Sequence, residues 1–151
     1  MTELVIADPA QRRDLALFAD RLVRLDPGAV VRLRARADGM VAAWARTPFD
    51  VLACRVVEAE LSPQDVTCGA RELSRGEPGP PMDFAWRGAL PPESGFVHVD
   101  DVPASVVTSL QESQALEVTD GTTTVTVAMR CAQALTALGF LPQPLPAQEV
   151  V

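Results

Sequence analysis

The residues with the most chemical potential in this chain form the short run His98-Val99-Asp100-Asp101. In an extended strand, His98 and Asp100 project from the same face, so the carboxylate could orient the imidazole or join it on a metal ion. The chain contains one His, so further ligands would have to come from other residue types elsewhere. Two interpretations stay open: His98 and Asp100 line a binding or catalytic site, or they are structural surface residues.

A second candidate is an arginine series, Arg32, Arg34 and Arg36, with one apolar residue between neighbours. This spacing puts the three guanidinium groups on one face of a β-strand. Arginine binds carboxylates and phosphates through two parallel hydrogen bonds, so this face could bind an acidic peptide or a small anion. Arg46 or Arg55 from neighbouring strands could extend it. The alternative is a solvated sheet face balanced by nearby acids.

Three cysteines, Cys54, Cys68 and Cys131, are the other candidates for reactive groups. No Cys-x-x-Cys pair occurs, and one His cannot complete a standard zinc site. A Cys–His dyad with His98 has no local nucleophile signature, and only Cys68 lies near an expected helix start that could lower its pKa. We expect three reduced thiols that pack as small apolar side chains, and we assign no catalytic residue, metal or cofactor.

The residue types that are absent limit the chemistry further. The sequence has no Lys, Asn or Tyr, and it lacks a Gly-rich phosphate loop and the G-x-S-x-G and H-E-x-x-H motifs. We therefore expect a binding protein rather than an enzyme. The same bias, with Ala, Arg, Pro, Val and Gly abundant, indicates a bacterial source with GC-rich DNA.

The charge is concentrated in the second half of the chain. Residues 1–75 contain eleven Arg and eleven acids, whereas residues 76–151 contain two Arg and nine acids. A helix-plus-hairpin pattern after residue 103 superficially resembles a winged helix, but no cation lies between Gly88 and Thr126. Nucleic-acid binding needs a basic surface, so nucleic acid is not an expected partner.

The sequence gives no sign of a membrane or secretory segment. Its apolar runs, such as Val41 to Ala45, are too short to span a bilayer. The start, Met1-Thr2-Glu3-Leu4, lacks the basic and apolar regions of a signal peptide. We expect an acidic cytoplasmic protein without membrane association.

The elements that must position these residues are well signalled in the first half. Asp8 and Pro9 have the types of an N-cap and a first helical residue, and apolar residues at helical spacing predict a helix that ends at Pro27-Gly28. Ser62 predicts the N-cap of a second helix, which runs to about Arg75 with Val66, Ala70 and Leu73 toward the core.

A β-meander is expected between these helices, over residues 29–61. Asp38-Gly39 predicts a two-residue hairpin turn, which would place Leu33 opposite Trp44 in the core. The third strand of the meander would cover residues 49–61.

Residues 76–95 contain a high density of Pro and Gly and predict a long crossing loop, with a linker between two lobes as the alternative. Phe84-Ala85-Trp86-Arg87 could form a short strand within it. Trp86 could close the core beneath the loop or, with Phe84, anchor an interface.

The second half predicts shorter elements. We expect a strand at residues 96–99, a helix over 103–114, a hairpin of 116–119 and 122–127 around Asp120-Gly121, and a last helix over 129–138 with Gly139 as its C-cap. The Pro-rich residues 142–151 are expected to be an extended or disordered tail.

Together these elements predict one α+β domain over residues 1–141: a mainly antiparallel sheet, built from a meander plus hairpins, with three to four helices packed on it. We expect a non-catalytic protein-interaction, adaptor or chaperone-like module with a protein partner, or a homodimer through the sheet face or the Trp86 loop. The alternative is a small-molecule-binding protein or enzyme whose pocket is lined by the arginine series and by His98 and Asp100.

Overall fold

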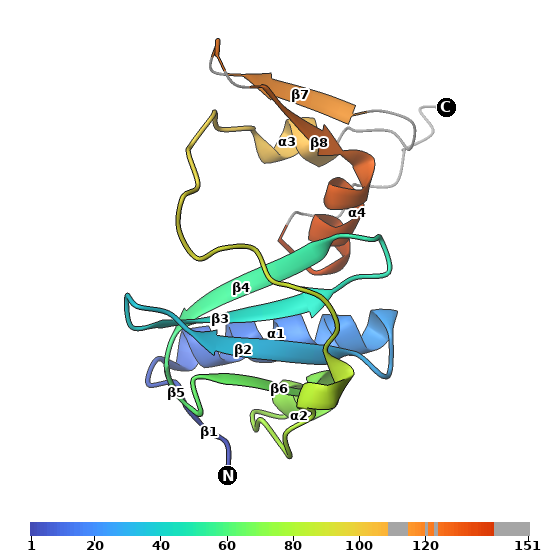
Figure 1. Cartoon of the computed structure of the whole chain (residues 1–151). Coiled ribbons are helices and arrows are strands. Elements are labelled where there is room, and N and C mark those ends of the chain that lie inside the picture. The colour runs from blue at the N-terminus through green and yellow to red at the C-terminus, as the bar shows by residue number, and fades with distance from the viewer. Residues whose placement is uncertain (109–114, 120, 123, 141–151) are drawn as a thin grey trace, which may run out of the picture. The chain divides into compact units, whose positions relative to one another are not determined.

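The computed structural model describes residues 1–108, 115–119, 121–122 and 124–140. Their contacts group into two units, Met1–Gly95 and Phe96–Val151, which we call the N-terminal and the C-terminal unit and describe separately (Figure 1). The boundary lies at the end of the Pro/Gly-rich stretch. The single domain over residues 1–141 stays a prediction, and the expected tail at 142–151 lies outside the described residues.

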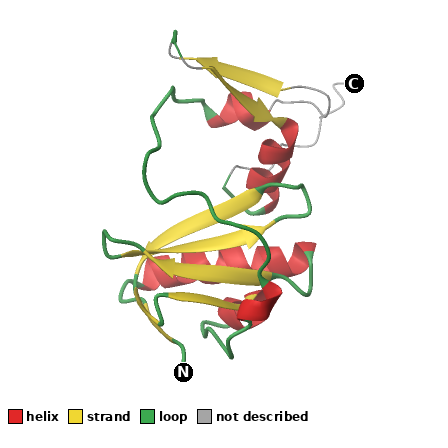
Figure 2. Ribbon diagram, viewed as in Figure 1, coloured by secondary structure: helices red, strands yellow, loops and turns green. Residues whose placement is uncertain are grey.

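The N-terminal unit is a four-stranded antiparallel sheet with the order β4-β3-β2-β6, and a long helix covers one of its faces (Figure 2). Its elements are β1 (Glu3–Val5), α1 (Pro9–Leu25), β2 (Val30–Ala35), β3 (Met40–Arg46), β4 (Leu52–Glu58), β5 (Glu60–Ser62), β6 (Asp65–Gly69), α2 (Ala70–Ser74) and the 3-10 turn η1 (Asp83–Ala85). Strands β1 and β5 pair separately as a two-stranded sheet.

Helix α1 forms as predicted and supplies one side of the core. The Asp8 carboxylate accepts a hydrogen bond from the Ala10 N–H at 2.9 Å, which caps the helix. The side chains that α1 and the inner face of the sheet bury together are Leu15, Phe18, Ala19, Leu22, Val31, Leu33, Val41, Ala43, Val57, Val66 and Cys68. Hydrophobic burial along this seam fixes which face of the sheet stays open.

The hairpin between β2 and β3 forms at Asp38-Gly39, but its predicted register is wrong by one residue. Arg32, not Leu33, lies opposite Trp44. The loop has three residues instead of two, since the Arg36 N–H donates to the Met40 carbonyl oxygen at 2.8 Å and Gly39 adopts a φ of +80°. A shift of one residue exchanges the two faces of a strand, so Trp44 leaves the core and joins the arginines.

The predicted helix over residues 62–75 is wrong in its first part. Residues 65–69 form β6, which pairs with β2, and the helix begins only at Ala70. The β-branched Val66 and Thr67 suit an edge strand, where ladder hydrogen bonds replace the helical ones that the Ser-Pro start suggested. Val66, Ala70 and Leu73 are nevertheless buried, as predicted.

The other departures in this unit are local. The expected third strand over residues 49–61 is divided into β4 and β5, and the expected strand at residues 84–87 is instead the turn η1 followed by extended chain. The segment after η1 crosses the face of the sheet opposite α1 (Figure 2), which we call the outer face. It thereby positions Trp86 and Arg87 over that face.

The C-terminal unit contains α3 (Ala104–Thr108), β7 (Ala115–Thr119), β8 (Thr124–Ala128) and α4 (Met129–Ala137). The hairpin and the last helix are confirmed, and β7 pairs with β8 from Ala115 opposite Ala128 to Thr119 opposite Thr124. The predicted strand at residues 96–99 is wrong, because no strand is found there. Residues 109–114 of the predicted helix lie outside the described residues.

The mixture of helices and antiparallel sheets in the two units confirms the α+β class. In the part of the chain that the structure describes, every helix is too short or too polar to cross a bilayer.

Candidate functional site

The outer face of the sheet brings together several of the candidate residues. Because side chains alternate along a strand, Arg32 and Arg34 of β2 share this face with Trp44 and Arg46 of β3. Arg36 lies just beyond the end of β2, in the hairpin loop. The sequence therefore placed Arg32 and Arg34 correctly on one side of a strand, and Arg46, one of the two arginines expected to extend the series, shares their face. Arg55, the other, lies on the opposite face of the sheet and pairs with Asp14 of α1.

Arg32 is held by a carboxylate from the adjacent edge strand. Its Nε donates to Asp65 Oδ1 at 2.9 Å and its Nη2 donates to Asp65 Oδ2 at 2.7 Å. This two-pronged hydrogen bond lowers the pKa of Asp65 below its ordinary value and raises that of Arg32. The guanidinium group of Arg32 is thus already hydrogen-bonded to an acid of the same unit.

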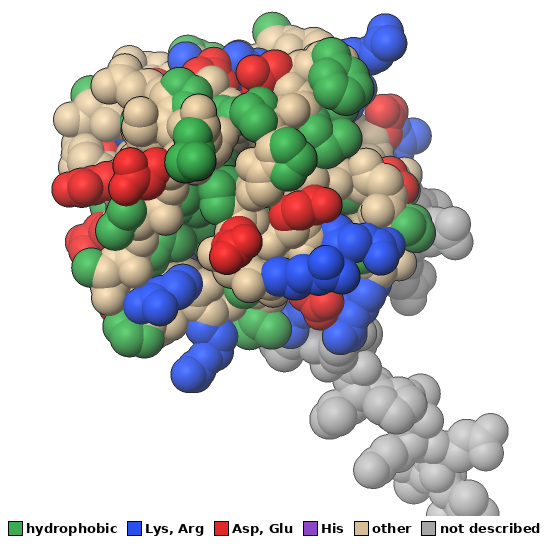
Figure 3. Space-filling model, turned by 90° about the horizontal axis from the view of Figure 1, so that it is seen from below, with side chains coloured by type: hydrophobic (Ala, Val, Ile, Leu, Met, Phe, Trp, Pro, Cys, Tyr) green, Lys and Arg blue, Asp and Glu red, His purple; other side chains and the backbone are tan. Residues whose placement is uncertain are grey.

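The rest of the arginine series is also paired with acids. Arg34 Nε lies 3.7 Å from Asp65 Oδ2, and Arg36 Nη2 lies 3.0 Å from Asp38 Oδ2. Acidic and basic side chains also lie close together on the side of the molecule that is seen from below (Figure 3). The series therefore carries much less free positive charge than its sequence suggests.

Trp86 and Asp83 attach the crossing segment to the outer face. The Arg32 guanidinium carbon lies 5.9 Å from the centre of the Trp86 ring, a cation–π distance. The Asp83 carboxylate accepts the Thr67 N–H at 2.7 Å, and the Thr67 carbonyl oxygen accepts the Met82 N–H at 2.7 Å. Since β6 is an edge of the sheet, these two bonds close part of an edge that would otherwise be open.

Two hollows lie on either side of Trp86. The first, which we call the Arg32 hollow, has a volume of about 360 Å³ and is lined by Arg32, Asp65, Thr67, Asp83, Trp86 and Gly88. The second, the Arg46 hollow, has a volume of about 150 Å³ and is lined by Arg46, Thr47, Asp50, Val51, Leu52, Trp86, Arg87, Gly88 and Ala89. Both belong entirely to the N-terminal unit.

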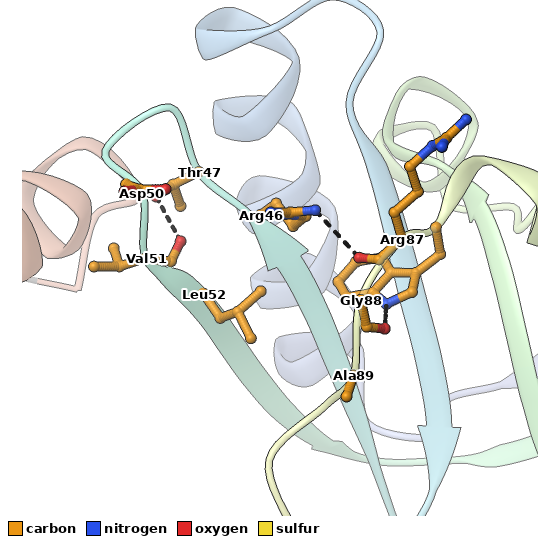
Figure 4. A pocket seen from close by; sticks show the side chains of 9 residues that line it. Arg46, Thr47, Asp50, Val51, Leu52, Arg87, Gly88 and Ala89 are labelled. Atoms are coloured by element: carbon orange, nitrogen blue, oxygen red, sulfur yellow. Dashed lines mark hydrogen bonds between the residues drawn. The ribbon is translucent and has the colours of Figure 1, made fainter.

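The Arg46 hollow differs in how its cations are used. Arg46 Nη1 donates to the Arg87 carbonyl oxygen at 3.2 Å (Figure 4). Within the described residues, neither Arg46 nor Arg87 forms an ion pair. The Trp86 indole N–H donates to the Gly88 carbonyl oxygen at 3.2 Å, which fixes the wall between the two hollows.

Phe84 is the most exposed aromatic residue near these hollows. It lies on η1, two residues before Trp86, and its exposed fraction is 80%. Asp83 and Met82, which precede it, are bonded to Thr67. The turn therefore presents a large apolar side chain to solvent from an anchored backbone.

The expected pairing of His98 with Asp100 is wrong. His98 Nε2 lies 2.9 Å from Asp101 Oδ1 instead, because this segment is not a strand and residues three apart can meet. The Asp100 carboxylate accepts the N–H of Asp101. Both members of the His98–Asp101 pair are exposed, with 72% and 98% of their side-chain surface accessible. Among the described residues, no group of three or more His, Cys, Asp and Glu could hold a metal ion.

Two of the three thiols are too deeply placed to ionise easily. Burial, with a smaller contribution from Glu72, raises the pKa of Cys68 to about 12. Burial also raises the pKa of Cys54 to about 11, although Arg36 acts in the opposite direction. A thiol with such a pKa is protonated at neutral pH and is a poor nucleophile. The helix start near Cys68 does not acidify it.

Sequence reasoning did not identify the acidic residues that form the hydrogen bonds of this surface. Asp65 was assigned to a helix start, and no role was assigned to Asp83 or Arg87. Asp65 hydrogen-bonds to a residue 33 positions away in the chain and Asp83 to one 16 positions away, so only the folded arrangement of β2, β6 and η1 brings these partners together. The exposed Phe84 beside Trp86 was the one local signal.

Comparisons with known proteins give a family but no activity. A family model described as Domain of unknown function (DUF8010) matches residues 1–88. This segment contains the four-stranded sheet, η1, Trp86 and all but one of the residues that line the two hollows. No curated protein and no solved structure matches the chain.

Proposed function

The chain belongs to the family defined by the Domain of unknown function (DUF8010), and we propose that it is a non-catalytic protein-interaction module of the adaptor or chaperone-like kind. Its contact surface would be centred on Phe84 and Trp86, inside the matched segment. We also propose that the protein is bacterial and cytoplasmic, in keeping with the composition of the chain.

The observation that carries this proposal is the exposure of Phe84. A phenylalanine with 80% of its surface in water gains free energy when a partner covers it. Aromatic residues that insert into a partner commonly supply a large part of the binding energy of an interface. Leu52, at 38% exposed, adds apolar surface at the edge of the Arg46 hollow.

The backbone around Phe84 supports the same interpretation. Bonds from Asp83 and Met82 to Thr67 fix η1 on β6, and Trp86 is held by Arg32 and the Gly88 carbonyl oxygen. A side chain presented from an anchored turn loses less conformational entropy on binding than one on a loose loop. The outer face is thus preorganised for contact.

The test is affinity capture from native lysate with three immobilised forms of the full chain: wild type, Phe84→Ala and the control Leu17→Ala. Leu17 is exposed, at 45%, and lies on α1. We expect one stoichiometric protein on wild type and Leu17→Ala that is lost from Phe84→Ala. An empty wild-type column, or equal retention by Phe84→Ala, would overturn the proposal.

The second candidate is a small-molecule-binding protein or enzyme, and the size of the Arg32 hollow favours it. A volume of about 360 Å³ is within the range of about 300–1,000 Å³ typical of small-ligand sites. Against it, Arg32 is already bonded to Asp65. A thermal-shift screen of metabolites on wild type and Trp86→Ala separates the candidates, because a ligand in this hollow would stabilise only the wild type.

A further inference from the structure

The Arg46 hollow holds cations whose hydrogen-bonding capacity is largely unused. A guanidinium group has five N–H donors, and the described residues offer that of Arg46 one acceptor, the Arg87 carbonyl oxygen. Arg87 is exposed, and its side chain extends away from Arg46 at the rim of the hollow (Figure 4). Arg32, Arg34 and Arg36 on the same sheet each have a carboxylate within 4.0 Å. Arg46 and Arg87 are therefore the arginines of this hollow that have no carboxylate partner among the described residues.

The charges in the hollow favour an anion over a cation. Two arginines and one acid, Asp50, line it. Asp50 lies at the opposite end from Arg87, with Arg46 between them (Figure 4). An incoming carboxylate on the Arg87 side of Arg46 would therefore be attracted mainly by the Arg46 guanidinium, with a weaker, longer-range attraction from Arg87, and would stay farther from the acid that lines the hollow.

The size of the hollow distinguishes a side chain from a metabolite. Its volume of about 150 Å³ is below the range of about 300–1,000 Å³ for small-ligand sites. A single Asp or Glu side chain fits this space. Val51 and the exposed Leu52 form the apolar part of the lining, so a neighbouring apolar residue of the same segment would also be buried.

We propose that the Arg46 hollow binds an aspartate or glutamate side chain of the partner protein, with Arg46 as the primary contact and Arg87 as a second cation at the rim. The inference rests on the proposed function, because it names the chemistry of the segment that docks beside Phe84 and Trp86. The ligand class is an acidic peptide segment with an apolar residue next to the acid.

The test uses a random twelve-residue peptide library displayed on phage and selected on the full wild-type chain. Enriched peptides are synthesised, and their Kd values are measured by fluorescence anisotropy on wild type, Arg46→Gln, Phe84→Ala and Arg71→Gln. Arg71 is the matched control, since it is an exposed arginine on α2 that has no ion pair within the described residues.

We expect the enriched peptides to share an Asp or Glu, and Arg46→Gln to raise their Kd about tenfold or more, as loss of a charged hydrogen bond does. Arg71→Gln should leave the Kd unchanged. A change of the shared acid in the peptide to its amide should weaken wild-type binding similarly, and this measurement needs no protein variant.

The two proposals fail in different ways. Peptides that lose affinity for Phe84→Ala but lack a shared acid, or that bind Arg46→Gln as tightly as wild type, would overturn the carboxylate site and leave the interaction surface intact. Absence of any enriched peptide, or affinity that Phe84→Ala does not change, would overturn the interaction surface and the site with it. Self-association of the chain that Arg46→Gln abolishes, without peptide binding, would make a second copy the occupant and overturn the proposed partner.

Discussion

The two hollows on the outer face of the sheet are each lined by an arginine, but the two arginines have different hydrogen-bond partners. In the Arg32 hollow, the guanidinium is fixed by Asp65 through two hydrogen bonds and lies over Trp86. In the Arg46 hollow, across Trp86, the guanidinium has a single carbonyl partner among the described residues. An arginine of the first kind stabilises the fold, whereas one of the second kind is available to a ligand.

The difference arises from the neighbouring strand rather than from the arginines. Strand β2 lies beside β6, which brings Asp65 opposite Arg34 and next to Arg32. Strand β3 lies between β2 and β4, and the residues of β4 that flank Arg46 are apolar: Leu52 is its direct partner. Charge alone therefore does not identify a binding arginine, and its cross-strand neighbours do.

The largest expected effect on the free energy of unfolding comes from the hydrogen bond that closes the β6 edge beside the Arg32 hollow. Asp83→Ala removes the acceptor of the Thr67 N–H, and Thr67 is only 2% exposed. An unsatisfied buried donor costs about 1–3 kcal/mol. We expect the free energy of unfolding to fall by about this amount in urea titrations followed by Trp fluorescence, because Trp44 and Trp86 both lie in the N-terminal unit.

The control for this variant is Glu77→Ala, which removes an exposed acid from the Pro/Gly-rich stretch that leads into η1. It should leave the unfolding free energy unchanged, and Asp83→Asn, which keeps an acceptor oxygen, should recover most of the loss. Equal stability of Asp83→Ala and Glu77→Ala would show that the edge of β6 needs no closure.

The next largest effect on the unfolding free energy is expected from Arg32, the arginine that is paired with Asp65. Arg32→Gln breaks the fork with Asp65 and the contact with Trp86, and we expect a loss of about 1–2 kcal/mol of unfolding free energy. This range already allows for solvent screening, since 42% of the Asp65 side chain is exposed. Urea unfolding of the full chain measures it, and a loss below about 0.5 kcal/mol would place Arg32 with the unpaired arginines.

Sequence reasoning predicted the helices and hairpins better than it predicted the register in which the strands pair. The cap at Asp8 and the hairpin at Asp120-Gly121 are local signals, and both elements form. The register of β2 on β3 depends on one extra loop residue, which the Asp-Gly pair does not specify because it suits loops of two and of three residues. That single residue moved Trp44 from the core to the outer face.

The candidate site was located in part for the same reason. Alternation along one strand correctly put Arg32 and Arg34 on one face, since a period of two needs only local information. Which of the arginines are neutralised depends on Asp65, whose strand the sequence assigned to a helix. The contrast between the two hollows was therefore beyond the reach of a local pattern.

A smaller effect is a pH dependence from Asp65. Arg32 lowers the pKa of this carboxyl in the folded state, so its contribution is fully present above the unfolded value of about 3.9 and is lost as the pH falls through the folded value. We expect Asp65→Asn to be about 0.5–1 kcal/mol less stable than wild type at pH 7. Urea unfolding between pH 7 and pH 2.5 should show this gap closing below about pH 4, and a gap that stays constant would contradict the ion pair.

The smallest expected effect is the most discriminating. Arg46→Gln removes the same charge as Arg32→Gln from the same sheet face, but Arg46 is exposed, and so is its hydrogen bond to the Arg87 carbonyl oxygen. We expect its unfolding free energy to stay within about 0.5 kcal/mol of wild type. Comparison of the two variants under identical urea titrations isolates the effect of the internal carboxylate. If Arg46→Gln is as destabilising as Arg32→Gln, Arg46 is a structural residue, and its unused donors are no longer an argument for a partner's acid.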